Sequence, residues 1–109
     1  MRPICEIDIF GDKYWYLYGE LHREDGPAIE LVDGFKAWYL NGKYHREDGP
    51  AVEYTSGSKS WYINGKFHRE DGPAIESANG TKEWYYHGKH IHCKDNEEYC
   101  KIIKLIIFL

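Results

Sequence analysis

Apolar and polar positions alternate over short segments of the chain, and each segment is bounded by turn residues. Residues 27–31 and 36–40 read as two such strands, joined by turn residues at 32–34. Asn41-Gly42 follows the second strand and favours a tight type I′ turn, because both central residues of that turn have positive φ. The pattern therefore predicts short antiparallel hairpins.

The pattern returns with a period of 23 residues. The run His-Arg-Glu-Asp-Gly-Pro-Ala occurs at residues 22–28, 45–51 and 68–74, and Trp-Tyr pairs keep the same step at Trp15-Tyr16, Trp38-Tyr39, Trp61-Tyr62 and Trp84-Tyr85. A fixed period of this length is typical of stacked supersecondary units. We predict a mainly β fold, a single-layer antiparallel β-hairpin repeat array in one domain over residues 1–109, with the repeats at 11–90 and a closing strand within 1–10.

The end of the chain departs from the repeat. Asp95 is a good helix N-cap, and Glu97 and Glu98 suit the first turn of a helix. Apolar residues then follow at helical spacing: Tyr99, Ile102, Ile103 and Ile106. We predict a C-terminal capping α-helix at residues 95–108, which lays these side chains over the open end of the array. The alternative is that the helix docks on a partner.

Strand alternation sorts the side chains into two faces. We expect one buried apolar stripe that combines the tryptophan positions with the strand before them: Trp15, Leu17, Trp38, Leu40, Trp61, Ile63, Trp84, Tyr86, Ile29, Val52 and Ile75. The opposite face is expected to carry a tyrosine row and an acidic row: Tyr16, Tyr39, Tyr62, Tyr85, Glu30, Glu53 and Glu76.

Tyrosine offers a large contact area with few torsions to freeze, so this second face is the candidate partner-binding surface. The alternative is that the tyrosines only pack between strands. Positions that drift from unit to unit are free to specialise for a partner, and we add Ala37, Tyr54 and Glu83 to the candidate contacts on that ground.

The charge balance narrows the partners. Lys plus Arg total 14 and Asp plus Glu total 18, which gives a net charge of −4. Nucleic acid and anionic membranes attract clustered Lys and Arg, so neither is an expected partner. The run 102–109 is too short to span a bilayer, which needs ~20 apolar residues. Three cysteines and a start without a secretory signal favour a reducing, cytoplasmic compartment.

Two clusters contain metal-ligand residue types. The histidines and aspartates of the repeated run (His22, His45, His68, Asp25, Asp48, Asp71) occur three times, whereas a catalytic site is one asymmetric constellation. We interpret them as turn-stabilising residues. His90, His92 and Cys93 alternate on a strand, and Cys100 or Asp95 would have to complete a site, so solvated residues are the favoured interpretation. Inert thiols are expected at all three cysteines, and no metal, cofactor or enzymatic activity is predicted.

The segments Trp38 to Ala51 and Trp61 to Ala74 resemble the MORN-repeat variant family of giant viruses, bacteriophages and bacteria. The resemblance covers roughly residues 11–90, with Tyr18-Gly19 and His87-Gly88 departing from the Asn-Gly pattern. It implies a non-catalytic β-hairpin scaffold, and some bacterial relatives are described as antitoxins that neutralise a partner protein.

These observations favour a non-enzymatic protein-binding module that inhibits a partner. An acidic, aromatic surface suits a target with a basic groove, such as a nuclease or a CRISPR effector, in a phage anti-CRISPR or antitoxin-like role. The alternatives are a structural or adaptor repeat protein that forms homo-oligomers and, less favoured, a metal-binding protein.

Overall fold

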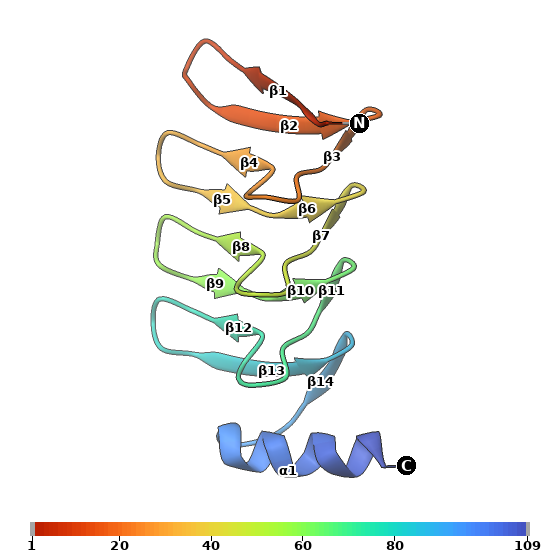
Figure 1. The fold of residues 1–109 in the computed structure, drawn as a ribbon. Helices are drawn as coiled ribbons and strands as arrows, with labels where there is room; N and C mark the ends of the chain where they lie inside the picture. Colours follow the sequence, from red (N-terminus) through yellow and green to blue (C-terminus); the bar gives the residue numbers. More distant parts are fainter. Residues whose placement is uncertain (1, 109) are drawn as a thin grey trace.

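The computed structural model describes residues 2–108, which form fourteen short strands and one helix (Figure 1). In chain order the elements are β1 (Ile4–Ile7), β2 (Lys13–Leu17), β3 (Glu20–Leu21), β4 (Ile29–Glu30), β5 (Lys36–Ala37), β6 (Tyr39–Leu40), β7 (Lys43–Tyr44), β8 (Val52–Glu53), β9 (Lys59–Ser60), β10 (Tyr62–Ile63), β11 (Lys66–Phe67), β12 (Ile75–Glu76), β13 (Lys82–Tyr86), β14 (Lys89–Ile91) and α1 (Asn96–Ile107).

The hairpins stack one after another along the chain, with β1 and β2 at one end and α1 at the other (Figure 1). Every strand pairing is antiparallel, and the main sheet runs β1-β2-β4-β5-β8-β9-β12-β13-β14, with β3 beside β2. The pairs β6-β7 and β10-β11 form two-stranded sheets of their own. The molecule measures 47 × 32 × 17 Å. The predicted single-layer hairpin array is confirmed.

A tight turn with two positive φ angles ends the second strand of each unit. Asn41 has φ 52° and Gly42 has φ 76°, as a type I′ turn requires. The same backbone is present at Tyr18-Gly19, Asn64-Gly65 and His87-Gly88. The predicted turn therefore forms in all four units, including the two that lack asparagine.

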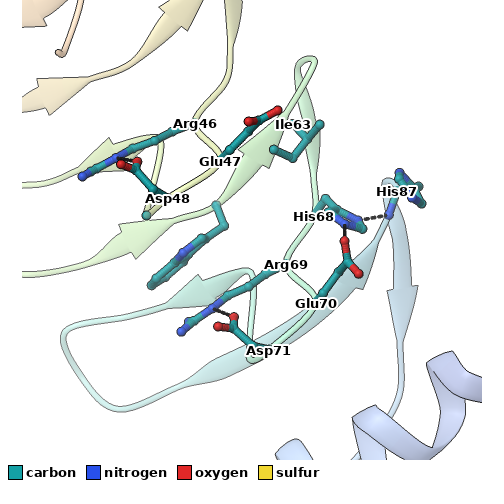
Figure 2. Close-up of a pocket in the computed structure, with 11 residues that line it drawn as sticks. Arg46, Glu47, Asp48, Ile63, His68, Arg69, Glu70, Asp71 and His87 are labelled. Carbon is teal, nitrogen blue, oxygen red and sulfur yellow. Dashed lines mark hydrogen bonds and ion pairs between the residues drawn. The ribbon is translucent and has the colours of Figure 1, made fainter. Parts of the chain in front are cut away.

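The tight turns of the second, third and fourth units are hydrogen-bonded to the preceding unit. The Asn41 N–H donates to Nδ1 of His22 at 2.9 Å, and the Gly42 N–H donates to the Leu21 carbonyl at 2.9 Å. The next two junctions repeat this: Asn64 donates to His45, and His87 donates to His68 (Figure 2). Because Nδ1 accepts a hydrogen bond, the neutral ring carries its proton on Nε2. These histidines join consecutive units.

The register corrects the expected assignment of faces. Glu30 lies opposite Lys13 and Lys36, and directly opposite residues of an antiparallel pair share a face. Lys13 and Trp15 are two positions apart on β2 and therefore point to the same face. Glu30 thus lies on the same side of the sheet as Trp15. We call this the tryptophan side; it also holds Glu53 and Glu76.

The apolar residues of the first strand in each unit lie on the other side. Ile29 is opposite Tyr14 and Ala37, so it shares a face with Tyr16, and Val52 and Ile75 occupy the equivalent places. We call this the tyrosine side. The expected single apolar stripe and the expected acidic row beside the tyrosines were both wrong, because the register places Ile29 opposite Tyr14 and Ala37, and Glu30 opposite Lys13 and Lys36.

Burial is spread thinly along the array and concentrated at its helical end. Small residues are fully buried in the repeats, on both sides of the sheet: Ala28, Ala37, Ala51 and Ala74. The cluster of buried large residues consists of Trp84, Ile91, Tyr99 and Ile103, where α1 packs on the last unit.

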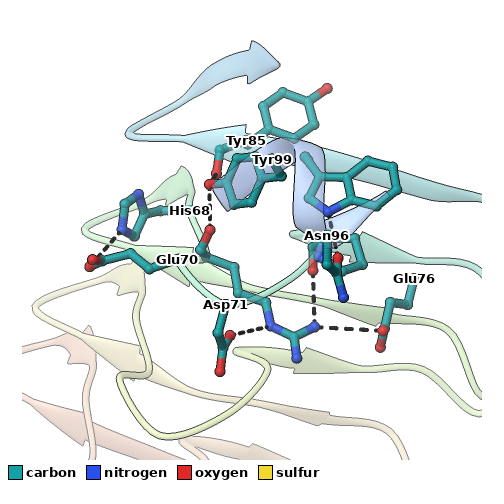
Figure 3. Close-up of polar contacts among 10 residues, drawn as sticks. His68, Glu70, Asp71, Glu76, Tyr85, Asn96 and Tyr99 are labelled. Carbon is teal, nitrogen blue, oxygen red and sulfur yellow. Dashed lines mark hydrogen bonds and ion pairs between the residues drawn. The ribbon is translucent and has the colours of Figure 1, made fainter. Parts of the chain in front are cut away.

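The helix covers the end of its own array. Asp95 is the N-cap and accepts a hydrogen bond from the Glu98 N–H at 2.9 Å, as predicted. The Tyr99 hydroxyl lies 2.5 Å from the Arg69 carbonyl and 2.9 Å from the Tyr85 carbonyl (Figure 3). Asn96 accepts a hydrogen bond from Nε1 of Trp84 at 2.8 Å. Tyr99 and Ile103 are buried as expected, whereas Ile106 is exposed.

The opposite end is less covered. The predicted strand within residues 1–10 forms as β1, which pairs with β2, and all four of its residues are exposed. Met1, part of that prediction, lies outside the described residues.

No helix within residues 2–108 has the length and hydropathy needed to cross a membrane. Cys5, Cys93 and Cys100 are free thiols.

Replacing His22 by isoleucine tests the junction between units. Isoleucine stands at the equivalent position of the fourth unit, Ile91, where no further turn needs an acceptor. The variant removes the acceptor of the Asn41 N–H, which is expected to lower the free energy of unfolding by about 0.5–1.5 kcal/mol in urea denaturation. His92→Ile, at an exposed position, is the control. Equal stability of the two variants would show that this hydrogen bond does not matter.

Replacing Tyr99 by phenylalanine tests the anchor of the helix. Loss of the hydroxyl removes the one hydrogen that the Arg69 and Tyr85 carbonyls share, and a net cost of about 0.5–1.5 kcal/mol is expected. Tyr18→Phe, at a side chain that is 81% exposed, is the control and should be neutral. Thermal unfolding followed by circular dichroism measures both, and a neutral Tyr99→Phe variant would contradict the anchoring role.

Candidate protein-binding surface

The repeated loop is built around an arginine. The Arg23 guanidinium lies 3.9 Å from the centre of the Trp15 ring, a cation–π contact. Its Nε donates to Asp25 at 2.8 Å, and its Nη1 donates to the Pro27 carbonyl at 3.1 Å. A Cβ on Gly26 would lie 2.9 Å from the Arg23 Cζ, so only glycine leaves room for the guanidinium. The motif Arg-Glu-Asp-Gly-Pro therefore encodes one loop conformation.

The loops of the next two units repeat this geometry. Arg46 and Arg69 lie 3.8 Å and 3.9 Å from the rings of Trp38 and Trp61. Each arginine also pairs with a strand glutamate: Arg23 with Glu30 at 3.5 Å, Arg46 with Glu53 at 3.1 Å and Arg69 with Glu76 at 3.6 Å. The glutamates predicted to contact a partner are thus engaged within the array.

The histidines and aspartates of the motif serve separate structural contacts. Nδ1 of His22 accepts from the next turn, while Asp25 binds Arg23. The Arg23 hydrogen bond, and then its charge, hold the pKa of the Asp25 carboxyl below its usual range. Within residues 2–108 no three His, Cys, Asp or Glu side chains are grouped so as to hold a metal ion. The geometry agrees with the structural interpretation of this motif.

Three grooves lie on the tryptophan side, two of them between successive loops and one before the first loop. The largest has a volume of about 780 Å³ and lies between the loops that begin at Arg46 and Arg69, with Trp61, Ile63 and His68 between them (Figure 2). The other two, of about 650 and 560 Å³, have the equivalent lining one and two units earlier. In the last of these, Arg2 and Pro3 replace a preceding loop.

Exposed carboxylates border every groove. Each loop carries a glutamate and an aspartate whose side chains are between 68% and 88% exposed: Glu24, Asp25, Glu47, Asp48, Glu70 and Asp71. The Nε2 atom of a neutral histidine lies 3.4–3.7 Å from each of these glutamates. The loop arginine offsets one of the two negative charges, so each loop contributes a net charge of −1.

The tyrosine side holds a continuous ladder of aromatic rings. Tyr39, Tyr44, Tyr62, Phe67, Tyr85, His90 and His92 follow one another with centroid separations of 4.4–4.9 Å. Burial, and then the charges of neighbouring tyrosines, raise the pKa of Tyr62 to about 12. Burial also raises the pKa of Tyr39, and its hydrogen bond with Tyr44 adds to this. The Tyr44 and Phe67 positions, which drift in sequence, complete the ladder.

The remaining predicted contacts differ in accessibility. Tyr16 and the ladder tyrosines are half-buried, and Glu83 is half-buried beside Ile75 in the sheet. Tyr54 is 43% exposed and its ring meets Phe35 edge-on at 5.8 Å. Ala37 is fully buried, so it offers no surface to a partner and its selection as a contact is corrected.

The other cluster, at the junction with the helix, shows no assembled metal site. The His90 and His92 rings lie edge to face with centroids 4.4 Å apart. The Cys93 thiol donates to the Ile91 carbonyl at 3.7 Å, and burial, with the nearby Glu98 and Asp95 carboxylates, raises its pKa. In these surroundings the thiol keeps its proton to a higher pH than a free cysteine does.

Sequence reasoning missed the grooves. It interpreted the aspartates of the repeated run as turn-stabilising residues and gave neither them nor the adjacent glutamates a place on a binding surface. The usable signal was the repetition of a second carboxylate, Glu24 and its equivalents, that the turn itself does not need.

Comparison of the chain with protein-family models, curated proteins and solved structures found no match.

Raising the pH tests the packing of the tyrosine ladder. An unfolded tyrosine loses its proton near pH 10, whereas folded Tyr62 keeps it to about 12. The folded state binds more protons between these values, so stability is full below about pH 10 and falls as the pH rises towards 12. Tyr62→Phe should lose less stability than the unmodified protein between about pH 8 and pH 11 in urea denaturation. The control is Tyr18→Phe, which keeps Tyr62. If Tyr62→Phe lost as much stability over this pH range as the control does, the assignment would be contradicted.

Proposed function

We propose that this chain is a non-enzymatic protein-binding module that occupies a basic surface of a partner protein and thereby inhibits it. The observation that supports this best is the row of three grooves, each bordered by exposed Glu-Asp pairs at equivalent positions. A regular row of negative charge on a rigid scaffold complements a positively charged partner surface and steers its association.

A binding role accounts for the repetition better than catalysis does. Each histidine, arginine and aspartate of the motif occurs in three equivalent settings and is engaged in local contacts. Chemistry requires one site with distinct acid, base and binding groups, whereas an extended interface gains from many equal contacts.

A nuclease or defence effector is the proposed partner class. Such proteins hold nucleic acid in a channel lined by Lys and Arg, and an acidic surface competes for that channel. The resemblance of the repeats to antitoxin-like and phage MORN-repeat variants supports an anti-CRISPR or antitoxin-like role in the cytoplasm of a bacterial host.

Self-association is the second candidate, favoured by one end of the array. The strand β1 is paired on one side with β2, and Ile4 and Ile7 are 70% and 62% exposed. An exposed edge strand is a template for pairing with another chain. Sedimentation velocity over a wide concentration range separates the two candidates, since a monomer at all concentrations excludes this one.

The inhibitor role is tested by capture followed by an activity assay. Tagged protein is incubated with bacterial lysate, retained proteins are identified by mass spectrometry, and any retained nuclease is purified and assayed with and without the protein. We expect a nuclease to be enriched stoichiometrically and its activity to fall as the protein is added.

A matched pair of variants ties the effect to the grooves. The triple variant Glu24→Gln, Glu47→Gln, Glu70→Gln removes three groove carboxylates, and Glu6→Gln, Glu20→Gln, Glu97→Gln removes three exposed carboxylates elsewhere. The first should weaken inhibition at least about tenfold and the second by less than about threefold. Capture of chaperones alone, or a retained nuclease of unchanged activity, would reject the proposed function.

A further inference from the structure

We infer that the groove row binds an extended segment with polyproline II geometry that carries Lys or Arg at every third residue. This inference rests on the proposed function and specifies the partner segment that the row recognises. It follows from the lining of one groove and from the distance between grooves.

One groove has the shape and chemistry of a site for a long cationic side chain. Between the loops that begin at Arg23 and Arg46, Trp38 and Leu40 supply apolar surface, and Glu24, Asp25, Glu47 and Asp48 supply carboxylates. Lys and Arg bury their methylene stems on apolar surface while the charged group stays at the polar rim. The same side chain would fit the groove with Trp61 and Ile63, which has a larger volume.

The loop arginines do not cancel this preference. Arg46 donates Nε to Asp48, and its Nη1 reaches the Pro50 carbonyl and Glu53, so its charge is neutralised locally. Glu47 lies 3.7 Å from Nε2 of the neutral His45, is 83% exposed and remains available to an incoming cation. The first and third loops repeat these contacts.

The distance between grooves selects the backbone conformation of the ligand. Each unit adds two strands to the main sheet, for example β4 and β5 and then β8 and β9. Strands lie ~4.8 Å apart, so equivalent grooves recur every ~10 Å. A polyproline II helix rises ~3.1 Å per residue with three residues per turn, which returns every third side chain to the same side after ~9.3 Å.

A β-strand would not satisfy the same condition. Three residues of a β-strand also cover ~10 Å, but the side chains at positions i and i+3 point to opposite faces. Spacings of two or four residues share a face but advance ~7 or ~13 Å, out of step with the grooves. A polyproline II segment with a basic residue at every third position is therefore the ligand whose period matches the array.

Two synthetic peptides of identical composition test the inference. The first repeats Lys-Pro-Pro four times, and the second places its four lysines in one block followed by the eight prolines. Fluorescence anisotropy of labelled peptide is recorded with the full-length protein at low salt. We expect the periodic peptide to bind at least about tenfold more tightly than the block peptide.

The two triple variants locate the contact. Glu24→Gln, Glu47→Gln, Glu70→Gln should weaken binding of the periodic peptide at least about tenfold, and Glu6→Gln, Glu20→Gln, Glu97→Gln by less than about threefold. Equal binding of both peptides, equal loss in both variants, or no binding of the periodic peptide would each overturn the inference. If a nuclease is nevertheless captured and inhibited, the proposed function survives and the partner uses another segment or another surface.

Discussion

A hydrogen bond between a tight turn and the histidine of the preceding unit is repeated at all three junctions of the array, where it adds to the pairing of the strands. A type I′ turn projects its backbone N–H groups outward, and in a protein this thin there is little interior to bury them. Nδ1 of His22 and the Leu21 carbonyl accept two of these donors and so set the position of the second unit on the first. Repeating this contact builds the array by nearest-neighbour interactions alone, as in other solenoids.

The last unit shows how that series of hydrogen bonds ends. Ile91 replaces the histidine because no further turn approaches it, and it packs with Trp84, Tyr99 and Ile103 instead. The helix replaces the missing loop: Asn96 accepts a hydrogen bond from the Trp84 indole, and the Tyr99 hydroxyl reaches the Tyr85 carbonyl of the last unit and the Arg69 carbonyl of the loop before it. The array therefore has one firmly closed end and one open edge at β1.

The 23-residue period, the turns and the helix N-cap were predictable because each is determined by a short run of neighbouring residues. Asn41-Gly42 and Asp95 impose their conformations with few distant contacts. The assignment of faces was not predictable, since the register of Ile29 against Ala37 depends on how the loop at 31–35 closes, and polarity alone does not report it. The grooves were missed because they exist only between units, although each wall comes from one recognisable motif.

Because the units are nearly uniform, the length of the array is set by their number. That length is the number of units multiplied by the distance between them, and because segments such as 45–51 and 68–74 are identical, a unit could be added or removed without a change in the contacts between the others. Length would then change in steps of ~10 Å. If the complementary surface of a partner became longer or shorter, a change in the number of units would match it without new side chains.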